Sequence, residues 1–263
     1  MTRRRFFLPR EHIRNGIATL PPQQAHHLRH VLRVPAGSEV ELFDGCGGVY
    51  RGTVEFHGTR VRVVSLREVD SAPEPRSRLI LGAALIKPDR FELVLEKGTE
   101  LGVDEFVPLL TRFCNIRIPE NRLEERMKRW ERIVQEACRQ CGRASVPAVG
   151  RPAGFAGFLE ENRSRGSGFL LYENAAKCRP LHLPQSDRIV LCVGPEGGWD
   201  EAEVRAAENA GWEVFRLGST ILRAETAAIA AVALFRLGVD TCAGFFQERR
   251  EEQRGCGRPP GSA

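Results

Sequence analysis

The stretch Val193-Gly-Pro-Glu-Gly-Gly-Trp-Asp200 leaves an apolar segment, passes through a glycine-rich loop and ends on an acidic residue suited to begin a helix. The glycines allow the backbone to approach a ligand closely, and the Asp200 side chain can cap the helix that follows. Leu217-Gly-Ser-Thr-Ile-Leu-Arg-Ala-Glu-Thr226 repeats this arrangement one unit later. Ligands in open α/β sheets bind beside the carboxyl ends of strands, so the two loops predict a pocket.

The segments around these loops alternate between strand and helix patterns. Apolar or alternating runs predict strands at residues 79–86, 105–110, 169–172, 189–193 and 213–217. Apolar residues at helical spacing predict helices at residues 89–101, 120–141, 200–210 and 225–237. Such alternation predicts an α/β domain, in which helices cover both faces of a parallel sheet.

The N-terminal quarter of the chain has a different pattern. Short strands at residues 4–8, 39–43, 49–56 and 60–69, separated by glycine turns, predict a small β-barrel with one inserted helix at residues 22–33. The proline-rich segment Ser71-Ala-Pro-Glu-Pro-Arg-Ser77 separates the two patterns. The expected boundaries are a barrel at residues 1–70, a linker at 71–78, an α/β domain at 79–246 and a disordered tail at 247–263.

The net charge of +5 is concentrated in the expected barrel, which holds eleven arginines, no lysine and seven acidic residues. A local basic excess is typical of a surface that binds a polyanion, although an ordinary solvated surface also explains it. Most of the basic residues of the whole chain are arginines. Arginine suits phosphate recognition, but a GC-rich genome produces the same bias.

Several classes of protein are excluded by what the sequence lacks. The longest apolar run, residues 227–235, is far shorter than the roughly 20 residues of a membrane helix. No glycine-rich dinucleotide motif, P-loop or serine-hydrolase motif is present. The eight cysteines are scattered and no signal peptide precedes them, which favours reduced thiols. We therefore expect a cytoplasmic protein without a membrane partner.

Two motifs have spacings that resemble metal sites. Cys138 and Cys141 fall on or beside the apolar stripe of an expected helix, and a second ligand pair at zinc spacing is absent, so both are expected to be buried. His26 and His30 lie one helical turn apart without an obvious third ligand, which favours a polar or RNA-facing helix surface. No metal is expected.

Leu222-Arg223-Ala-Glu225-Thr226 places a cation, an anion and a hydroxyl at the expected start of the last helix. This is more polar chemistry than a connecting loop needs. The residues alone leave the ligand of the expected pocket open.

Motifs spread over most of the chain indicate a family. They are Arg4-Arg5-Phe6-Phe7, His26-His27-Leu28 with Leu32-Arg33, Phe43-Asp44-Gly45, Lys87-Pro-Asp-Arg90, Glu96-Lys-Gly-Thr-Glu-Leu-Gly102, Gln135-Glu-Ala137 with Gln140 and Arg143, Gly194-Pro-Glu-Gly-Gly198 and residues 217–227. In this combination and order the chain resembles the bacterial ribosomal RNA methyltransferase family RsmE, of the SPOUT (trefoil-knot) superfamily. Gly-Pro-Glu-Gly alone is shared with other SPOUT enzymes.

The resemblance implies a PUA-like N-terminal barrel, a knotted α/β domain and a homodimer. It also implies methylation at N3 of a uridine in small-subunit (16S) ribosomal RNA, as free RNA or in a ribosomal particle, with S-adenosylmethionine held in the knot loops. Nothing in the periodicity predicts a knot, and base rates oppose one. The residues expected to bind the cofactor are Leu171, Tyr172, Gly194, Pro195, Glu196, Gly197, Gly198, Leu217, Gly218, Ile221, Leu222, Thr226 and Ala227.

The same loops suggest residues for the chemistry. Glu225 is the candidate base that removes the N3 proton, and Arg223 is the candidate for steadying charge on the uracil carbonyl or holding RNA phosphate. A structural ion pair between Arg223 and Glu225 at the helix start stays open as an alternative. The residues expected to contact RNA are Arg3, Arg4, Arg5, Arg10, His27, Arg29 and Arg33.

Two other functions compete with this prediction. One is a different SPOUT RNA methyltransferase, such as a ribose 2′-O enzyme. The other is a non-catalytic RNA-binding ribosome assembly factor that retains the fold. Cofactor binding and the position of the methyl group would separate the three.

Overall fold

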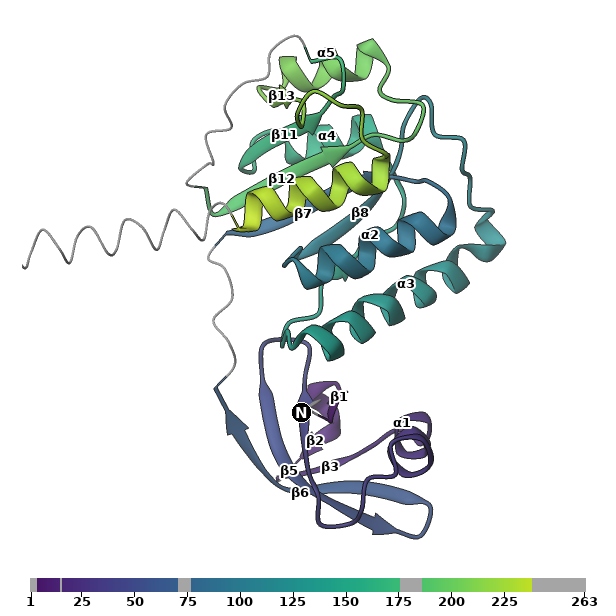
Figure 1. Cartoon of the computed structure of the whole chain (residues 1–263), viewed down its shortest axis with the longest axis vertical. Coiled ribbons are helices and arrows are strands. Elements are labelled where there is room, and N and C mark those ends of the chain that lie inside the picture. Colours follow the sequence, from purple (N-terminus) through teal and green to yellow (C-terminus); the bar gives the residue numbers. More distant parts are fainter. Residues whose placement is uncertain (1–3, 15, 71–76, 176–185, 238–263) are drawn as a thin grey trace, which may run out of the picture. The chain divides into compact units, whose positions relative to one another are not determined.

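The computed structural model describes residues 4–14, 16–70, 77–175 and 186–237, and the contacts divide the chain into two compact units (Figure 1). The first unit comprises residues 1–74 and 124–148, and the second comprises residues 75–123 and 149–263. This differs from the expected boundaries, since residues 124–148 group with the N-terminal unit. Most of the expected linker and all of the expected tail lie outside the described residues.

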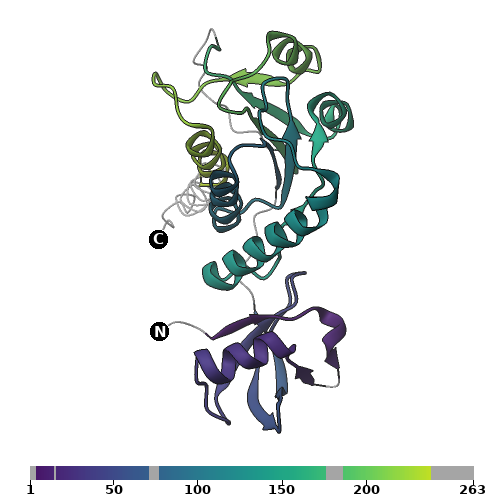
Figure 2. The same ribbon diagram turned by 90° about the vertical axis from the view of Figure 1, so that its right-hand side faces the viewer.

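The first unit contains a curled six-stranded sheet (Figure 2). The strand order is β1-β4-β5-β6-β3-β2, with β1 and β4 parallel and the other neighbours antiparallel. The strands are β1 (Arg5–Phe7), β2 (Ile13–Arg14), β3 (Ile17–Thr19), β4 (Glu39–Phe43), β5 (Val49–His57) and β6 (Arg60–Val69). The sheet curls into a half-barrel with β1 and β2 at its two ends, in agreement with the small β-barrel that the strand pattern predicted.

The helix expected at residues 22–33 lies against the core of this sheet. It consists of α1 (Pro22–His26) and a π-helical turn, η2 (His27–Val31), and a short 3-10 turn, η1 (Arg10–His12), lies earlier in the chain. Ala25 and Leu28 are buried with the sheet residues Leu42, Val54 and Val63. The helical periodicity therefore correctly predicts the helix and the burial of Ala25 and Leu28, whereas Val31, an apolar residue at the same helical spacing, is 61% exposed in the π-helical turn.

Residues 124–148 join the first unit through packing and hydrogen bonds. They include most of α3 (Glu120–Cys141). Cys138 and Ala144 are buried in one apolar cluster with Phe43 and Val49 of the sheet. The backbone amide of Val146 also donates to the carbonyl of Gly45. A local sequence pattern predicts the helix itself but not these distant partners.

The second unit is built on a parallel sheet with strand order β10-β8-β7-β12-β11-β13. Its strands are β7 (Arg78–Ala84), β8 (Glu105–Leu110), β10 (Ala153–Gly154), β11 (Ser167–Leu171), β12 (Arg188–Val193) and β13 (Glu213–Phe215), and β9 (Ala148–Val149) also pairs with β8. The predicted parallel sheet is confirmed. The very short β9 and β10 have no recognisable strand pattern.

Helices cover both faces of this sheet, as predicted (Figure 2). On one face, α4 (Phe155–Asn162) and α5 (Glu201–Asn209) contribute Phe158 and Val204 to a cluster with Leu170 and Val190 of the strands. On the other face lie α2 (Pro88–Glu100) and the helical residues 224–237. The ring centroids of Phe235 and Phe169 are 4.7 Å apart across this second interface.

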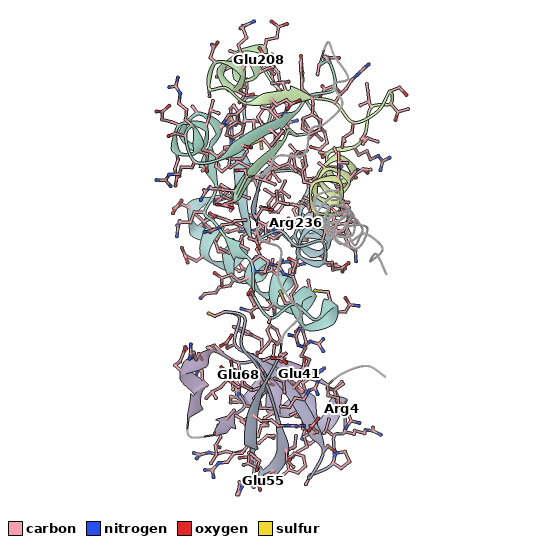
Figure 3. All side chains as sticks on the ribbon, turned by 90° about the vertical axis from the view of Figure 1, so that its left-hand side faces the viewer. Arg4, Glu41, Glu55, Glu68, Glu208 and Arg236 are labelled. Atoms are coloured by element: carbon pink, nitrogen blue, oxygen red, sulfur yellow. The ribbon has the colours of Figure 1, made fainter. Side chains whose placement is uncertain are left out.

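The buried Arg236 fastens the last helix to the unit (Figure 3). Its guanidinium donates to the carbonyls of Gly102 and Ser77 and forms an ion pair with Asp104. Because a buried guanidinium needs partners for its donors, these contacts fix the helix against the residues that lead into β7 and β8.

The register of three strands decides where the functional loops emerge. Leu171 of β11 is paired with Val193 of β12 on one side and with Phe215 of β13 on the other. The three strands therefore end level with one another. The loops that follow them start side by side at one edge of the sheet, as expected for a ligand site in a parallel sheet. None of the helices in the described residues is long and apolar enough to span a membrane.

Candidate functional site

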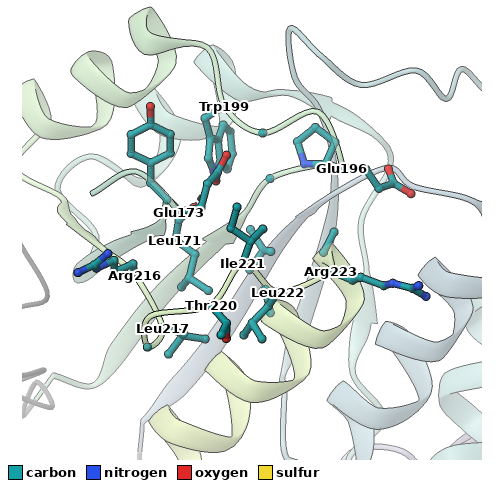
Figure 4. A pocket seen from close by; sticks show the side chains of 18 of the residues that line it. Leu171, Glu173, Glu196, Trp199, Arg216, Leu217, Thr220, Ile221, Leu222 and Arg223 are labelled. Atoms are coloured by element: carbon teal, nitrogen blue, oxygen red, sulfur yellow. Dashed lines mark hydrogen bonds between the residues drawn. The ribbon is translucent and has the colours of Figure 1, made fainter. Parts of the chain in front are cut away.

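The three loops enclose a cavity of about 300 Å³ (Figure 4). Most of the residues expected to bind the cofactor line it: Leu171, Tyr172, Gly194, Pro195, Glu196, Gly198, Leu217, Gly218, Ile221, Leu222 and Ala227. Gly197 and Thr226 do not. The candidate Arg223 does line the cavity, whereas Glu225 does not. Glu173, Trp199 and Thr220, which lie in the expected cofactor loops, and Arg216, which lies just before one of them, also line the cavity but were not among the residues expected to bind the cofactor.

The loop after β12 is held by its own residues. Asp200 caps α5, as predicted, because its carboxylate accepts a hydrogen bond from the backbone amide of Ala202. The backbone amide of Asp200 in turn donates a hydrogen bond to the carboxylate of Glu203. Such a capping box satisfies amides at a helix start that have no partner within the helix. The loop therefore keeps a fixed shape where it borders the cavity.

Trp199 connects this loop to the loop after β11. Its indole Nε1 donates a 2.8 Å hydrogen bond to the carbonyl of Leu171. A Cβ atom on Gly194 would lie only 2.8 Å from the same Nε1. Glycine at position 194 therefore lets the indole pack directly against the backbone.

The loop after β13 contributes a more open wall. Gly218 has φ +68, a backbone conformation that favours glycine, and the space where a Cβ would project is empty. Ile221 is 83% exposed although its side chain borders the cavity.

The composition of the lining fits S-adenosylmethionine. Leu171, Leu217 and Leu222 provide apolar surface for an adenine ring, and the three loops bring backbone donors and acceptors to the same space. The carboxylates of Glu173 and Glu196 supply negative charge, which suits the positively charged sulfonium. Arg216 and Arg223 also line the cavity and supply positive charge, which suits the carboxylate of the same cofactor.

Arg90 of α2 lies between two carboxylates of the candidate site. Its Nε is 3.7 Å from Oε1 of Glu225, and its Nη1 is 3.5 Å from Oε1 of Glu196. Glu225 is 8% exposed, and the structure gives its Oε2 atom no hydrogen-bond partner. The partner of Glu225 is thus Arg90 and not Arg223, which corrects the ion pair considered from the sequence.

The role of Arg90 was missed because it lies far from Glu225 in the sequence. Its segment, Lys87-Pro-Asp-Arg90, carries part of the family resemblance, but no function was attached to it. The segment opens α2, so its side chains start at the same edge of the sheet as the cavity. Its place directly after an apolar strand was the available signal.

Arg5 is a second correction, since it is not an RNA-contacting residue. It is 3% exposed, its Nη1 donates to the carbonyls of Cys138 and Arg143, and its Nε is 2.9 Å from Oε1 of Glu41. Burial lowers the pKa of Arg5, while the neighbouring Glu41 carboxylate acts in the opposite direction. Arg5 therefore fastens α3 and the segment after it to the sheet.

The other residues expected to contact RNA differ in how exposed their side chains are to solvent. Arg4, Arg10 and Arg33 are exposed, and His27 is half-buried. Arg29 lies over the ring of Phe56, 4.5 Å from its centroid, and donates to the carbonyl of Gly58. Arg3 lies outside the described residues.

The structure also shows where the two pairs with metal-like spacing lie. Cys138 is buried as predicted, but Cys141 is exposed, because it lies at the end of α3 beyond the apolar cluster. The exposed rings of His26 and His30 have centroids 4.7 Å apart. Within the described ranges, no three His, Cys, Asp or Glu side chains gather where they could hold a metal ion.

Comparisons with known proteins agree with this arrangement. Residues 72–236 match the model of an RNA methyltransferase domain, and residues 20–59 match that of an RNA methyltransferase PUA domain. The fold and the cavity are thus those of an RNA methyltransferase with a PUA-like N-terminal domain.

Similar proteins define the family more closely. Ribosomal RNA small subunit methyltransferase E of Synechocystis sp. is 36% identical over 230 residues, which cover 85% of this chain and 74% of that protein. The Mycobacterium tuberculosis protein of the same name is 33% identical over 234 residues, covering 86% and 87%. The chain belongs to the ribosomal RNA small subunit methyltransferase E family.

A solved structure supports the same assignment. Ribosomal RNA small subunit methyltransferase E from Neisseria gonorrhoeae, bound to S-adenosyl methionine, superposes with a TM-score of 0.81 at 33% identity. The match covers 89% of this chain and 97% of that one. The likeness therefore includes both units.

Proposed function

We propose that this chain transfers the methyl group of S-adenosylmethionine to N3 of a uridine in 16S ribosomal RNA of the small subunit. The observation that carries the proposal is the cavity formed by three loops at the carboxyl edge of the parallel sheet. Its lining suits the cofactor, and a family member of similar fold binds S-adenosyl methionine.

The cavity residues hold and orient the cofactor in this proposal. Leu171, Leu217 and Leu222 would supply apolar surface to the adenine ring, and the backbone of residues 194–196 and 198 with the Glu196 carboxylate would supply polar groups. Bound S-adenosylmethionine supplies a methyl group on a sulfonium, which a nucleophile in line with the carbon–sulfur bond can accept. Holding both reactants in this alignment accounts for much of the rate.

Glu225 is the proposed base for the N3 proton. Its Oε1 faces Arg90, while its buried Oε2 is an acceptor without a hydrogen-bond partner in the structure. A buried acceptor of this kind is uncommon and calls for an explanation, and proton uptake is one. Arg223, exposed at the cavity, is placed to steady negative charge on the uracil carbonyl.

The N-terminal unit is proposed to hold the RNA backbone. Arg4, Arg10 and Arg33 are exposed, and with Arg3, His27 and Arg29 they form the proposed contact set. Phosphate contacts of this type position the RNA without reading its sequence. The partner is small-subunit ribosomal RNA, alone or in a ribosomal particle, in the cytoplasm.

We also propose that the chain forms a homodimer. Leu93 of α2 and Leu234 and Leu237 of the last helix are exposed apolar residues, and both helices cover the same face of the sheet. Apolar side chains exposed on neighbouring helices are typical of an association surface. Light scattering of the purified protein measures its mass in solution, and a mass of two chains would support the homodimer.

The deciding experiment measures the methylated atom. Small subunits that lack the modification are incubated with the protein and S-adenosylmethionine labelled in its methyl group, and the nucleosides are then analysed by mass spectrometry. Label in 3-methyluridine supports the proposal, and label in a 2′-O-methyl nucleoside identifies a ribose methyltransferase. Cofactor binding without transfer to any small-subunit substrate would instead favour the assembly factor.

A further inference from the structure

A tight turn after β8 presents an aromatic ring to solvent. The amide of Cys114 donates to the carbonyl of Thr111, which closes the turn, and Phe113 between them is 43% exposed. Phenylalanine is mostly buried in folded proteins, so exposure on a fixed turn requires an explanation.

The turn is anchored on both sides of Phe113. The amide of Arg112 donates a 3.0 Å hydrogen bond to Oε1 of Glu203, and the thiol of the buried Cys114 donates to the carbonyl of Leu85. Glu203 uses its other carboxylate oxygen in the capping box with Asp200. One carboxylate therefore connects the turn to the cavity loop after β12.

Phe113 packs directly against that cavity loop. A Cβ on Gly197 would lie 3.0 Å from Cβ of Phe113 and 3.2 Å from its carbonyl oxygen. The neighbours of Gly197 in the chain, Glu196 and Gly198, both line the cavity. The backbone and Cβ of Phe113 are thus held against the loop that borders the cavity proposed to bind the cofactor.

The segment that carries Phe113 is basic, which favours a polyanion over an apolar protein partner. Arg112 and Arg117 are exposed, and no acidic residue occurs between Thr111 and Pro119. An aromatic ring flanked by arginines is a common way to hold single-stranded nucleic acid, since the ring stacks on a base and the cations meet phosphate.

The proposed chemistry requires such a contact. N3 lies on the pairing edge of uracil, so the target base must be unpaired when it accepts the methyl group. An enzyme that reacts with a base takes that base out of its stack and replaces the lost stacking with its own side chains.

We propose that Phe113 is a stacking platform for an unpaired base of the RNA substrate, next to the site of methyl transfer. The inference rests on the proposed function, because it takes the substrate to be RNA that reaches the cavity. Loss of one base–aromatic stack weakens binding by about 5- to 100-fold.

The test compares three variants that separate stacking from apolar bulk. Phe113→Ala removes the side chain, Phe113→Leu keeps apolar volume without a ring, and Phe113→Tyr keeps the ring. Binding of unmodified small subunits is measured by filter retention, the KM for them by methyl transfer, and cofactor affinity by calorimetry. We expect the Ala and Leu variants to bind the RNA substrate at least about 5-fold more weakly and the Tyr variant to bind like the parent. Cofactor affinity is expected to stay unchanged in all three.

The outcomes distinguish this inference from the proposed function. Wild-type RNA affinity in the Leu variant, or equal loss of cofactor and RNA binding in the Ala variant, overturns the stacking role. A parent protein that binds small subunits but does not methylate them contradicts the proposed function, while the binding data still decide the role of Phe113. If the parent binds no RNA substrate, both proposals fail.

Discussion

Nε of Arg90 lies 3.7 Å from Oε1 of Glu225, and the same guanidinium reaches Glu196 with its Nη1 atom. Glu196 belongs to the loop after β12, and Glu225 lies in the first turn of the last helix. One cation on α2 therefore connects two segments that border the cavity. Because Glu225 is buried, this contact compensates a charge that would otherwise be costly to remove from water.

Replacing Arg90 by Gln removes the charge that both carboxylates share. We expect the free energy of unfolding to fall by about 1–3 kcal/mol, because Glu225 is left buried without its cation. We also expect weaker binding of S-adenosylmethionine, since Glu196 lines the cavity. Urea denaturation and calorimetry measure the two effects. Arg205→Gln, which removes an exposed pair with Glu201 on α5, is the matched control and should change stability by about 0.5 kcal/mol or less. Unchanged cofactor affinity in the Arg90 variant would restrict Arg90 to a role in the fold.

Glu225→Gln tests the proposed base while keeping the size of the side chain. Loss of a positioned base should lower the single-turnover rate of methylation by about 10²–10⁴-fold. The rate of the variant should then rise with pH as N3 of the free uracil ionises, which restores part of the activity in alkaline buffer. Cofactor affinity is measured alongside, because a purely structural ion pair would change affinity and stability together. Full activity with the pH profile of the parent would eliminate Glu225 as the base.

Local patterns predicted the elements well but not their long-range partners. The strand at residues 105–110 and the helix at residues 120–141 match β8 and α3, since both patterns are long and regular. The short α4 was missed because its eight residues include a glycine and are too few to establish a helical period. The trefoil knot stays an expectation of the resemblance, since periodicity describes elements and not the path that joins them.

For the site too, the sequence predicted features that lie within one segment but not contacts between segments that are far apart in the chain. Glycine-rich loops after two strands predicted the cavity, because the carboxyl ends of parallel strands meet at one edge. The sequence showed the charge of Arg5 and Glu225 but not their partners. Those partners, Cys138 and Arg143 for Arg5 and Arg90 for Glu225, lie on remote segments.

Arg4 and Arg5 are neighbours in the sequence, but the structure exposes Arg4 and buries Arg5. Arg5→Ala leaves Glu41 without one of its two cations and removes the donor to the buried carbonyl of Cys138 and to the part-buried carbonyl of Arg143, so we expect a loss of about 2–4 kcal/mol in the free energy of unfolding. The exposed Arg4→Ala should change stability by less than about 0.5 kcal/mol. Arg4→Ala should weaken RNA binding, and the slope of the logarithm of the binding constant against the logarithm of the salt concentration should become about one unit less steep. Denaturation and salt-dependent RNA binding assign the two roles. Equal stability of the two variants would refute the structural role of Arg5.

Gly197→Ala tests whether the cavity loop sets the position of Phe113. The added methyl would press on Cβ and the carbonyl oxygen of Phe113, at 3.0 and 3.2 Å, so the turn must shift. We expect weaker binding of small subunits, in the same direction as Phe113→Ala. The double variant should be no weaker than Phe113→Ala alone, since residues in contact act non-additively. Gly157→Ala is the matched control, because its added Cβ meets open space on α4, where alanine favours the helix by about 1 kcal/mol. Additive losses in the double variant would mean that Gly197 affects RNA binding by a route that does not involve Phe113.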